Sequence, residues 1–228
     1  MDGLPRRADE KNDESTVLIS MTEVGVINYG IGNLGSVSSA LNQIGVSHFL
    51  IESSEDFDRA SHIILPGVGA FGVGMENLKK RGFDKDLRRI VSQKKPLLGI
   101  CLGMQLLASK GFEYGENEGL GFIPGKIVKL EVGDLRLPHV GWNDLKIIKA
   151  NAVFKENLQG QSVYFVHSFQ FIPDLDEDRS STTDYGGDFT SCVSHDNVYG
   201  AQFHPEKSQK YGLQILKNFC ELGVKAHA

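Results

Sequence analysis

Cys101 is the residue whose surroundings best fit covalent chemistry. It lies in the segment GICLG at 99–103, after the apolar run 96–100 and before an apolar helical stretch. This is the nucleophile-elbow pattern, in which a strained turn between a strand and a helix presents the nucleophile and flanking glycines let the backbone pass. The positive end of the following helix favours the thiolate. A structural cysteine buried at a tight strand–helix junction would fit these five residues equally well.

A candidate base stands at His204, in the segment FHPE that follows the apolar run 198–203. An imidazole there can take the proton of the thiol and later give it to a leaving amine. Glu206, two residues on, can orient the ring and stabilise its charged form. Pro205 keeps the preceding backbone extended, so both side chains can leave the strand on one side. An ordinary surface turn is the alternative interpretation of these residues.

A glycine-rich turn, PGVG at 66–69, follows the apolar run 62–65. Ligands of open α/β sheets bind at the carboxyl edge, where such a strand ends. Backbone N–H groups of this turn, together with the N–H of Leu102, could face a developing oxyanion. Taken alone, the segment is no more than a turn.

A second glycine turn, at 30–35, matches the dinucleotide-binding spacing G-x-G-x-x-G. It follows a strand, opens a helix and has Glu52 about 20 residues further on, so an NAD-dependent oxidoreductase is an alternative function. Two observations count against it. The chain left after such a domain is short for a substrate domain, and the fingerprint explains neither Cys101 nor His204.

Strands and helices that could position these residues alternate from residue 23 onward, as in a chain whose strands cross over through helices into a parallel sheet. We expect strands at 24–28, 48–51, 62–65 and 96–100, with helices at 33–44, 75–93 and after Cys101 through 108. The second half predicts strands at 163–169, 189–195 and 198–203, a surface loop at 174–187 and a packing helix at 210–224. The predicted fold class is therefore α/β, a mixed, mostly parallel open sheet flanked by helices.

Composition limits the remaining classes. The chain has 228 residues, 40% hydrophobic and 23% charged, which fits one globular domain at 23–228 behind a polar, flexible tail at 1–22. A net charge of −5 without a basic cluster disfavours a nucleic-acid partner. Three widely spaced cysteines indicate neither disulfides nor a metal site. With no signal sequence and no apolar run near the roughly 20 residues that span a bilayer, we expect a cytoplasmic protein without a membrane partner.

Seven segments together resemble class I glutamine amidotransferases: GICLGMQ, FHPEKS, PGVGAF, NYGIGN, GLGFIPGKI, LPHVGWN and YFVHSF. The set, above all LPHVGWN at 137–143 and NYGIGN at 28–33, is similar to the glutaminase subunits of imidazole glycerol phosphate synthase. The likeness extends from about residue 23 to 224 and implies a flavodoxin-like three-layer fold. It also implies roles for the residues above: Cys101 as nucleophile, His204 as base and Glu206 as its orienting group.

The resemblance implies an oxyanion hole made by the Gly67–Val68 peptide and the N–H of Leu102, with no metal or organic cofactor. It further implies that Asn33 contacts the partner near the ammonia exit. The implied glutamine site is formed by Gly69, Gln105, Glu113, His167, Ser168 and Phe169. Two positions depart from the family pattern. The stretch around Glu113, KGFEYGENEG, lacks the commoner acidic run, and Phe169 stands where many relatives carry tyrosine.

A partner enzyme follows from the same resemblance, because one glutaminase domain occupies the chain and free ammonia needs an acceptor. The implied partner is a (β/α)₈-barrel cyclase, forming a heterodimer that makes imidazole glycerol phosphate and a purine-pathway carboxamide nucleotide in histidine biosynthesis. A synthase that amidates nucleotide-activated sugars for surface polysaccharides is the alternative acceptor. A catalytically inactive relative is a third alternative, but such a protein would be expected to lose one of Cys101, His204 and Glu206, which are all present.

Overall fold

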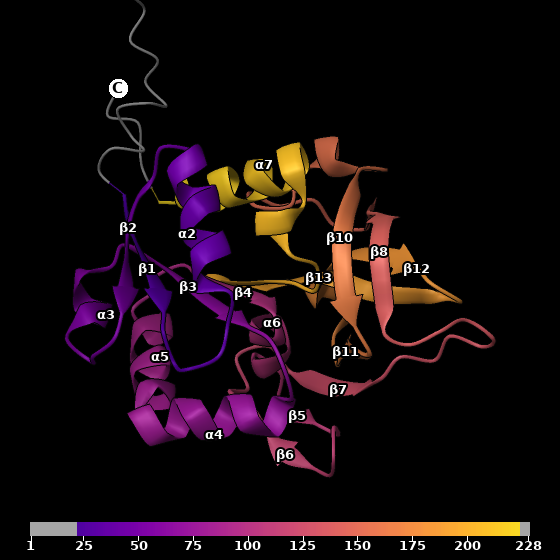
Figure 1. The fold of residues 1–228 in the computed structure, drawn as a ribbon, viewed down its shortest axis with the longest axis horizontal. Helices are drawn as coiled ribbons and strands as arrows, with labels where there is room; N and C mark the ends of the chain where they lie inside the picture. The colour runs from indigo at the N-terminus through magenta and orange to yellow at the C-terminus, as the bar shows by residue number, and fades with distance from the viewer. Residues whose placement is uncertain (1–21, 224–228) are drawn as a thin grey trace, which may run out of the picture.

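Residues 22–223 are described by the computed structural model of the chain (Figure 1). The tail predicted at 1–22 therefore lies outside the described residues except for Thr22, and so does the last residue of the helix predicted at 210–224. Thr22 is buried, and its hydroxyl donates a hydrogen bond of 3.2 Å to the carbonyl of Cys220. The ordered fold thus includes at least the last residue of that tail.

A parallel sheet forms the centre of the molecule, with the strand order β2-β1-β3-β4-β14. Its strands are β1 (Glu23–Ile27), β2 (Ser47–Ile51), β3 (His62–Gly67), β4 (Leu97–Cys101) and β14 (Val198–Ala201), and each pairs in parallel with its neighbours in this order. The inner strands β3 and β4 are buried along their whole length. Strands of this kind are covered by helices on both faces, which is why they read as continuous apolar runs.

Helices cover the parallel sheet on two sides (Figure 1). One layer contains α2 (Leu34–Gln43) and α7 (Gln209–Cys220), and the other contains α4 (Phe71–Arg81), α5 (Phe83–Ser92) and α6 (Leu102–Leu106), with the short α3 (Asp56–Arg59) near the edge of the sheet. The buried side chains accordingly fall into two clusters. Val26 packs with Leu41 and Leu216 in one cluster, and Leu65 packs with Leu78 and Leu87 in the other. The predicted three-layer α/β fold is confirmed. No helix within residues 22–223 is long and apolar enough to span a membrane.

The single helix predicted at 75–93 is wrong, because the chain forms α4 and α5 there. Gly82 separates them in the left-handed conformation, with φ of 74°. Its N–H bonds to the carbonyls of Leu78 and Lys79, which caps α4 and turns the chain before α5 begins. A glycine can adopt this conformation without steric cost, so it ends helices efficiently.

The second half of the sheet is mixed. Beyond β14 the strand order is β13-β11-β7-β5-β6, and a branch from β13 leads to β12, which pairs in turn with β9. These strands are β5 (Lys110–Gly111), β6 (Asn117–Glu118), β7 (Gly125–Lys129), β9 (Lys146–Ile147), β11 (Phe169–Pro173), β12 (Arg179–Asp184) and β13 (Asp188–His195). A separate antiparallel pair joins β8 (His139–Asp144) to β10 (Ser162–His167). Within residues 22–223 the chain also forms three short 3₁₀ turns: η1 (Glu156–Leu158), η2 (Asp176–Asp178) and η3 (Pro205–Lys207).

The strand predicted at 163–169 is two strands that belong to different sheets. β10 ends at His167, where its partner β8 begins, and β11 starts at Phe169 and pairs with β7. Ser168 lies at the break, and its carbonyl accepts a hydrogen bond of 2.9 Å from the N–H of Leu130. The run of apolar residues is continuous across this point, so its pattern does not reveal the change of partner.

The surface loop predicted at 174–187 is also wrong, since β12 fills most of its second half. Its residues 180–183 are buried although all four carry hydroxyl groups. The hydroxyl of Ser181 is paired with that of Ser191 on β13 at 2.8 Å, and that of Ser180 with Ser194 at 2.9 Å. Paired hydroxyls and β-branched threonines are compatible with a buried strand.

Candidate active site

Cys101 lies at the junction between β4 and α6, with φ of 55° and ψ of −112°. The two glycines around it are required by close backbone contacts. A Cβ on Gly103 would lie 1.8 Å from the carbonyl oxygen of Leu65, and a Cβ on Gly99 would lie 2.6 Å from that of Gly103. The predicted elbow pattern therefore corresponds to a strained turn in which the strand and helix touch, and which holds Cys101 at one fixed point.

Cys101 is 7% exposed, and its sulfur faces polar groups. The amide nitrogen of Gln202 lies 3.9 Å from Sγ, and the carbonyl oxygen of Val166 lies 3.8 Å from it. The orientation of Gln202 is fixed by Gln105, whose Nε2 donates to the Gln202 amide oxygen at 3.0 Å. The NH₂ group of Gln202 is thus directed at the sulfur, where it would stabilise a thiolate.

Gln202 is a functional candidate that the sequence analysis missed. It lies two residues before His204, and alternate residues of an extended chain face the same side. That spacing is the signal that could have identified it. Gln105, predicted to bind glutamine, directs its amide at Gln202 and, at 3.4 Å, at the carbonyl of Phe169.

His204 and Glu206 are held together by the turn η3. His204 Nδ1 donates to Glu206 Oε1 at 2.8 Å, and both side chains are almost completely buried. Burial lowers the pKa of His204, but its hydrogen bonds to Cys101 and Glu206 and the negative charges of both outweigh burial and raise the pKa to about 9. At neutral pH the ring therefore keeps its proton beside Cys101. The three residues form a chain from nucleophile to imidazole to carboxylate.

The glycine turn lies directly beside the nucleophile, since Gly67 is the register partner of Cys101 between β3 and β4. Gly69 has φ of 103°, which only glycine adopts readily. Val68 is 42% exposed at the edge of the same pocket. The structure thus brings the predicted oxyanion residues Gly67, Val68 and Leu102 to the site of Cys101.

A pocket of about 450 Å³ opens in front of Cys101. It is lined by every residue predicted to contact glutamine, namely Gly69, Gln105, Glu113, His167, Ser168 and Phe169, and by Cys101, Val68, Leu102 and His204. Lys207 also lines it and was not predicted. A volume of this size can take an amino acid, and the lining includes several polar side chains that could orient it.

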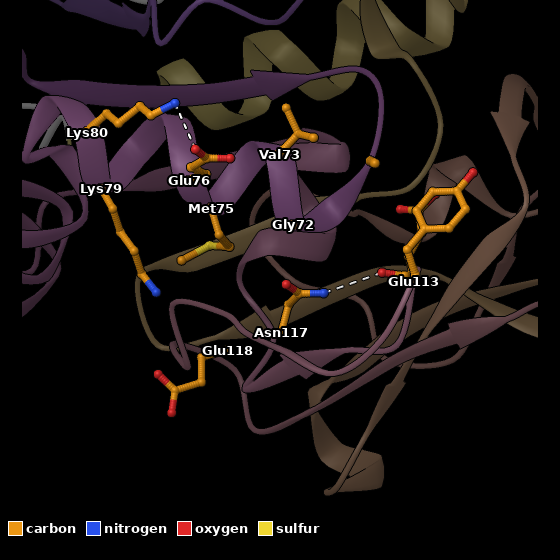
Figure 2. Close-up of a pocket in the computed structure, with 11 residues that line it drawn as sticks. Gly72, Val73, Met75, Glu76, Lys79, Lys80, Glu113, Asn117 and Glu118 are labelled. Atoms are coloured by element: carbon orange, nitrogen blue, oxygen red, sulfur yellow. Dashed lines mark hydrogen bonds and ion pairs between the residues drawn. The ribbon is translucent and has the colours of Figure 1, made fainter.

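Glu113 is fixed at the beginning of α4, where its carboxylate accepts a hydrogen bond of 2.8 Å from the N–H of Phe71. It also borders a second hollow, which lies between α4 and the β5–β6 hairpin. Figure 2 shows this hollow, with Glu113 at one end and the Asn117 amide directed at its backbone carbonyl, 3.3 Å away. Glu113 and its neighbour Tyr114 line both hollows, so they form the boundary between them.

His167 is paired with His139, a second candidate that the sequence analysis did not single out. His167 Nδ1 donates to the carbonyl of Phe169 at 2.8 Å, so its Nε2 must accept the 3.1 Å hydrogen bond from His139 Nδ1. Burial lowers the pKa of His167 to about 4 and also lowers the pKa of His139. Both rings are therefore neutral at pH 7 and fix the segment 167–169 in front of Cys101. Their opposed positions on the β8–β10 pair give the contact.

Asn33 does not line the pocket in front of Cys101. It caps α2, and its side chain accepts a hydrogen bond of 3.3 Å from the N–H of Ser36. Glu52, which would bind a ribose in the dinucleotide interpretation, instead accepts a 2.9 Å hydrogen bond from Asn28. Within residues 22–223, no group of three or more His, Cys, Asp or Glu side chains is arranged to bind a metal ion.

All three cysteines are free thiols, and two of them lie in the core. Burial raises the pKa of Cys192 far above its usual value. Burial, with a smaller contribution from Glu221, raises the pKa of Cys220 to about 12. Cys101 is the thiol that lines the pocket.

The family model "Glutamine amidotransferase class-I" matches residues 26–222. The chain is 44% identical over 201 residues to imidazole glycerol phosphate synthase subunit HisH 1 of Campylobacter jejuni, covering 87% of this chain and 100% of that protein. It is 45% identical over 197 residues to subunit HisH of Aquifex aeolicus, covering 85% and 94% of the two chains. Among solved structures, PurLQS from Thermotoga maritima superposes with a TM-score of 0.69 at 19% identity, over 87% of this chain and 97% of that one. A crystal structure of a glutamine amidotransferase gives a TM-score of 0.69 at 21% identity, over 86% and 96%.

Proposed function

Because the chain belongs to the class I glutamine amidotransferases, and within them to the HisH subunits of imidazole glycerol phosphate synthase, we propose that it releases ammonia from glutamine for a synthase partner. The observation that carries the chemistry is the chain of contacts from Cys101 through His204 to Glu206, beside a pocket large enough for an amino acid.

The reaction begins when the Cys101 thiolate attacks the side-chain amide carbon of glutamine. The carbonyl oxygen becomes an oxyanion, which the N–H groups of Val68 and Leu102 stabilise. Each such donor contributes on the order of 3 kcal/mol to lowering the barrier. Gln202 holds the sulfur in its charged form until the attack, because its amide is directed at Sγ.

His204 then gives its proton to the departing nitrogen, and ammonia leaves behind a thioester on Cys101. At this point the thiolate charge is gone, and with it part of the interaction that raises the pKa of His204. Burial now favours the neutral ring, which can take a proton from a water molecule as the oxygen of that water attacks the thioester carbon. Glutamate leaves, and Glu206 keeps the ring oriented through Nδ1 in both half-reactions. No step calls for a metal or an organic cofactor.

The acceptor of the ammonia is proposed from the relatives, which are named as subunits of imidazole glycerol phosphate synthase. We propose a (β/α)₈-barrel cyclase as the partner, a heterodimer with it, and a place in histidine biosynthesis in the cytoplasm. Exposed apolar side chains support a docking face. Val68 is 42% exposed at the pocket, and Val140 and Trp142 on β8 are 56% and 48% exposed. Exposed apolar groups that form a patch often mark a contact with another protein.

Replacing Cys101 by alanine tests the proposal. In the complex with the cyclase, Cys101→Ala should abolish glutamine-dependent synthesis and leave ammonia-dependent synthesis nearly unchanged, since only the production of ammonia needs the thiol. Cys220→Ala, in α7 and away from the pocket, is the matched control and should retain both activities. Glutamine-dependent synthesis by Cys101→Ala would rule out the assignment. Activity with a nucleotide-activated sugar in place of the cyclase substrate would redirect the acceptor and leave the glutaminase chemistry in place.

A further inference from the structure

Tyr29 carries a buried hydroxyl without a partner. The residue follows β1, is 2% exposed and packs in the same cluster as Leu65 and Leu102. Its hydroxyl makes no hydrogen bond with any group of residues 22–223. Buried hydroxyls are almost always hydrogen-bonded, because leaving one unpaired is unfavourable. An unpaired one near a reacting centre therefore points to a bond that forms in another state of the site.

The Tyr29 hydroxyl lies against the turn that precedes Val68. A Cβ on Gly67 would be 2.5 Å from the phenol oxygen, closer than to any other atom around it. The same Cβ would be 3.0 Å from Leu102 Cβ and 3.1 Å from the N–H nitrogen of Gly103. Position 67 must therefore be glycine in part because Tyr29 occupies the space beside it. The phenol and the turn are in direct contact.

Tyr29 and Cys101 approach this turn from different sides. Cys101 packs with the cluster that includes Leu41 and Leu216, and Tyr29 packs with the cluster that includes Leu65 and Leu102. Burial raises the pKa of Tyr29 far above its usual value, and the charge of the Cys101 thiolate acts in the same direction. The phenol is therefore a hydrogen-bond donor throughout the pH range in which the enzyme works.

We propose that Tyr29 is a positioning residue whose hydroxyl donates a hydrogen bond to the Gly67 carbonyl when the Gly67–Val68 peptide turns its N–H toward the substrate oxyanion. The N–H and C=O of a trans peptide point in opposite directions, so an N–H directed at the pocket places the carbonyl on the side away from Cys101. We place Tyr29 on that side because it contacts Gly67 and packs in a different core cluster from Cys101. The inference rests on the proposed function, because the oxyanion donor is part of it.

Since the hydroxyl is unpaired in the arrangement described, the bond belongs to the turned peptide alone. An interaction made only while the oxyanion exists changes kcat and leaves substrate binding unaffected. A phenol that only fills space predicts no effect on kcat. Its replacement by Phe would leave the rate unchanged and would remove an unsatisfied polar group from the core.

The test is Tyr29→Phe in the full chain, assayed as ammonia release from glutamine both alone and with the synthase partner. We expect kcat with the partner to fall about tenfold, which corresponds to about 1.4 kcal/mol, with KM unchanged. The melting temperature should be unchanged or higher, because the lost hydroxyl had no partner. Tyr199→Phe is the matched control. Tyr199 is on β14, packs against Phe154 and Phe219, and should keep the wild-type kcat.

Alkylation of Cys101 by iodoacetamide separates the turn from the thiolate, since this reaction needs the thiolate and no oxyanion hole. The rate of alkylation against pH should be the same in wild type and Tyr29→Phe. A wild-type kcat in Tyr29→Phe would overturn the proposal, and so would a lower kcat accompanied by a shifted alkylation profile or a lower melting temperature. Glutamine turnover that does not depend on Cys101 in the wild-type chain would instead overturn the proposed function, whatever Tyr29→Phe does.

Discussion

Replacing Glu206 by glutamine removes one buried negative charge and leaves the shape of the site almost unchanged. Oε1 of Glu206 accepts the 2.8 Å hydrogen bond from His204 Nδ1, whereas Oε2 is buried and bonds to nothing within residues 22–223. In Glu206→Gln the amide oxygen can take the place of Oε1, and the NH₂ group the place of the unbonded oxygen. The hydrogen bond survives, and what is lost is the charge.

The size of the effect follows from the difference between the two kinds of hydrogen bond. A bond to a charged group contributes about 1.5–3 kcal/mol and a neutral one about 0.5–1.5 kcal/mol, so the change removes about 1–2 kcal/mol. If that difference acts on the transition state, kcat falls about 5- to 30-fold. The pKa of His204, raised to about 9 with the help of Glu206, must fall at the same time. The alkaline limb of the rate profile, where the ring loses the proton that the leaving nitrogen needs, therefore moves to lower pH.

Ammonia release would be measured from about pH 6 to pH 10.5 with the partner present, comparing wild type, Glu206→Gln and Glu76→Gln. Glu76 is an exposed glutamate of α4 whose ion pair with Lys80 lies on the surface, so its replacement controls for the change in net charge. An unchanged kcat with an unshifted alkaline limb in Glu206→Gln would refute the reasoning. A loss of activity without any movement of the limb would show that Glu206 acts through shape and not through charge.

Three further outcomes are expected. Gly103→Ala should prevent stable folding, because its Cβ would lie 1.8 Å from the carbonyl oxygen of Leu65, whereas Gly35→Ala, in a helix with open space, should raise stability by about 0.5–1 kcal/mol; urea unfolding compares them. The pKa values of His62 and His167 in the folded protein are both lowered to about 4. The stability that these neutral rings give is therefore complete above their unfolded pKa near 6.5 and is lost as the pH falls toward 4. Melting temperatures across this range would show the decline, and a flat profile would contradict it. The isolated chain should hydrolyse glutamine slowly, and the partner with its ligand should raise kcat more than it lowers KM, because the gain would come from a Gly67–Val68 peptide turned toward the oxyanion. Full activity of the chain alone would show that this peptide does not depend on the partner.

The parallel half of the fold was predictable because its strands are buried on both faces. Runs such as 63–65 and 96–100 are apolar and are followed by glycine-containing turns, so both the strands and the sheet edge that carries the chemistry can be recognised. Polar strands and glycines within helical stretches were not predictable in this way. Residues 180–183 of β12 are buried although all four carry hydroxyl groups, and the two serine hydroxyls pair with serines of β13. Gly82 ends a helix only because its φ is positive, which an amphipathic pattern does not reveal.

Some residues of the candidate site were likewise predictable from the sequence and others were not. Cys101, His204 and the glycine turn could be found because their chemistry is tied to local spacing, and the structure brings them to one pocket. His139 could not be found in this way, and the spacing of Gln202 from His204 marks its position but not its role, since each matters through a partner far away in sequence. Gln202 acts on Cys101 and is oriented by Gln105, and His139 orients His167 across the β8–β10 pair.

The unequal surroundings of the three cysteines allow the active molecules in a sample to be counted. Cys192 and Cys220 are enclosed in the core with raised pKa values, whereas Cys101 faces the pocket. A glutamine-like electrophile in small excess should therefore attach to one sulfur per chain, and the mass added to an intact sample would report the fraction of molecules that are competent. Rates measured on different preparations, or on variants with different yields of folded protein, can then be expressed per working site.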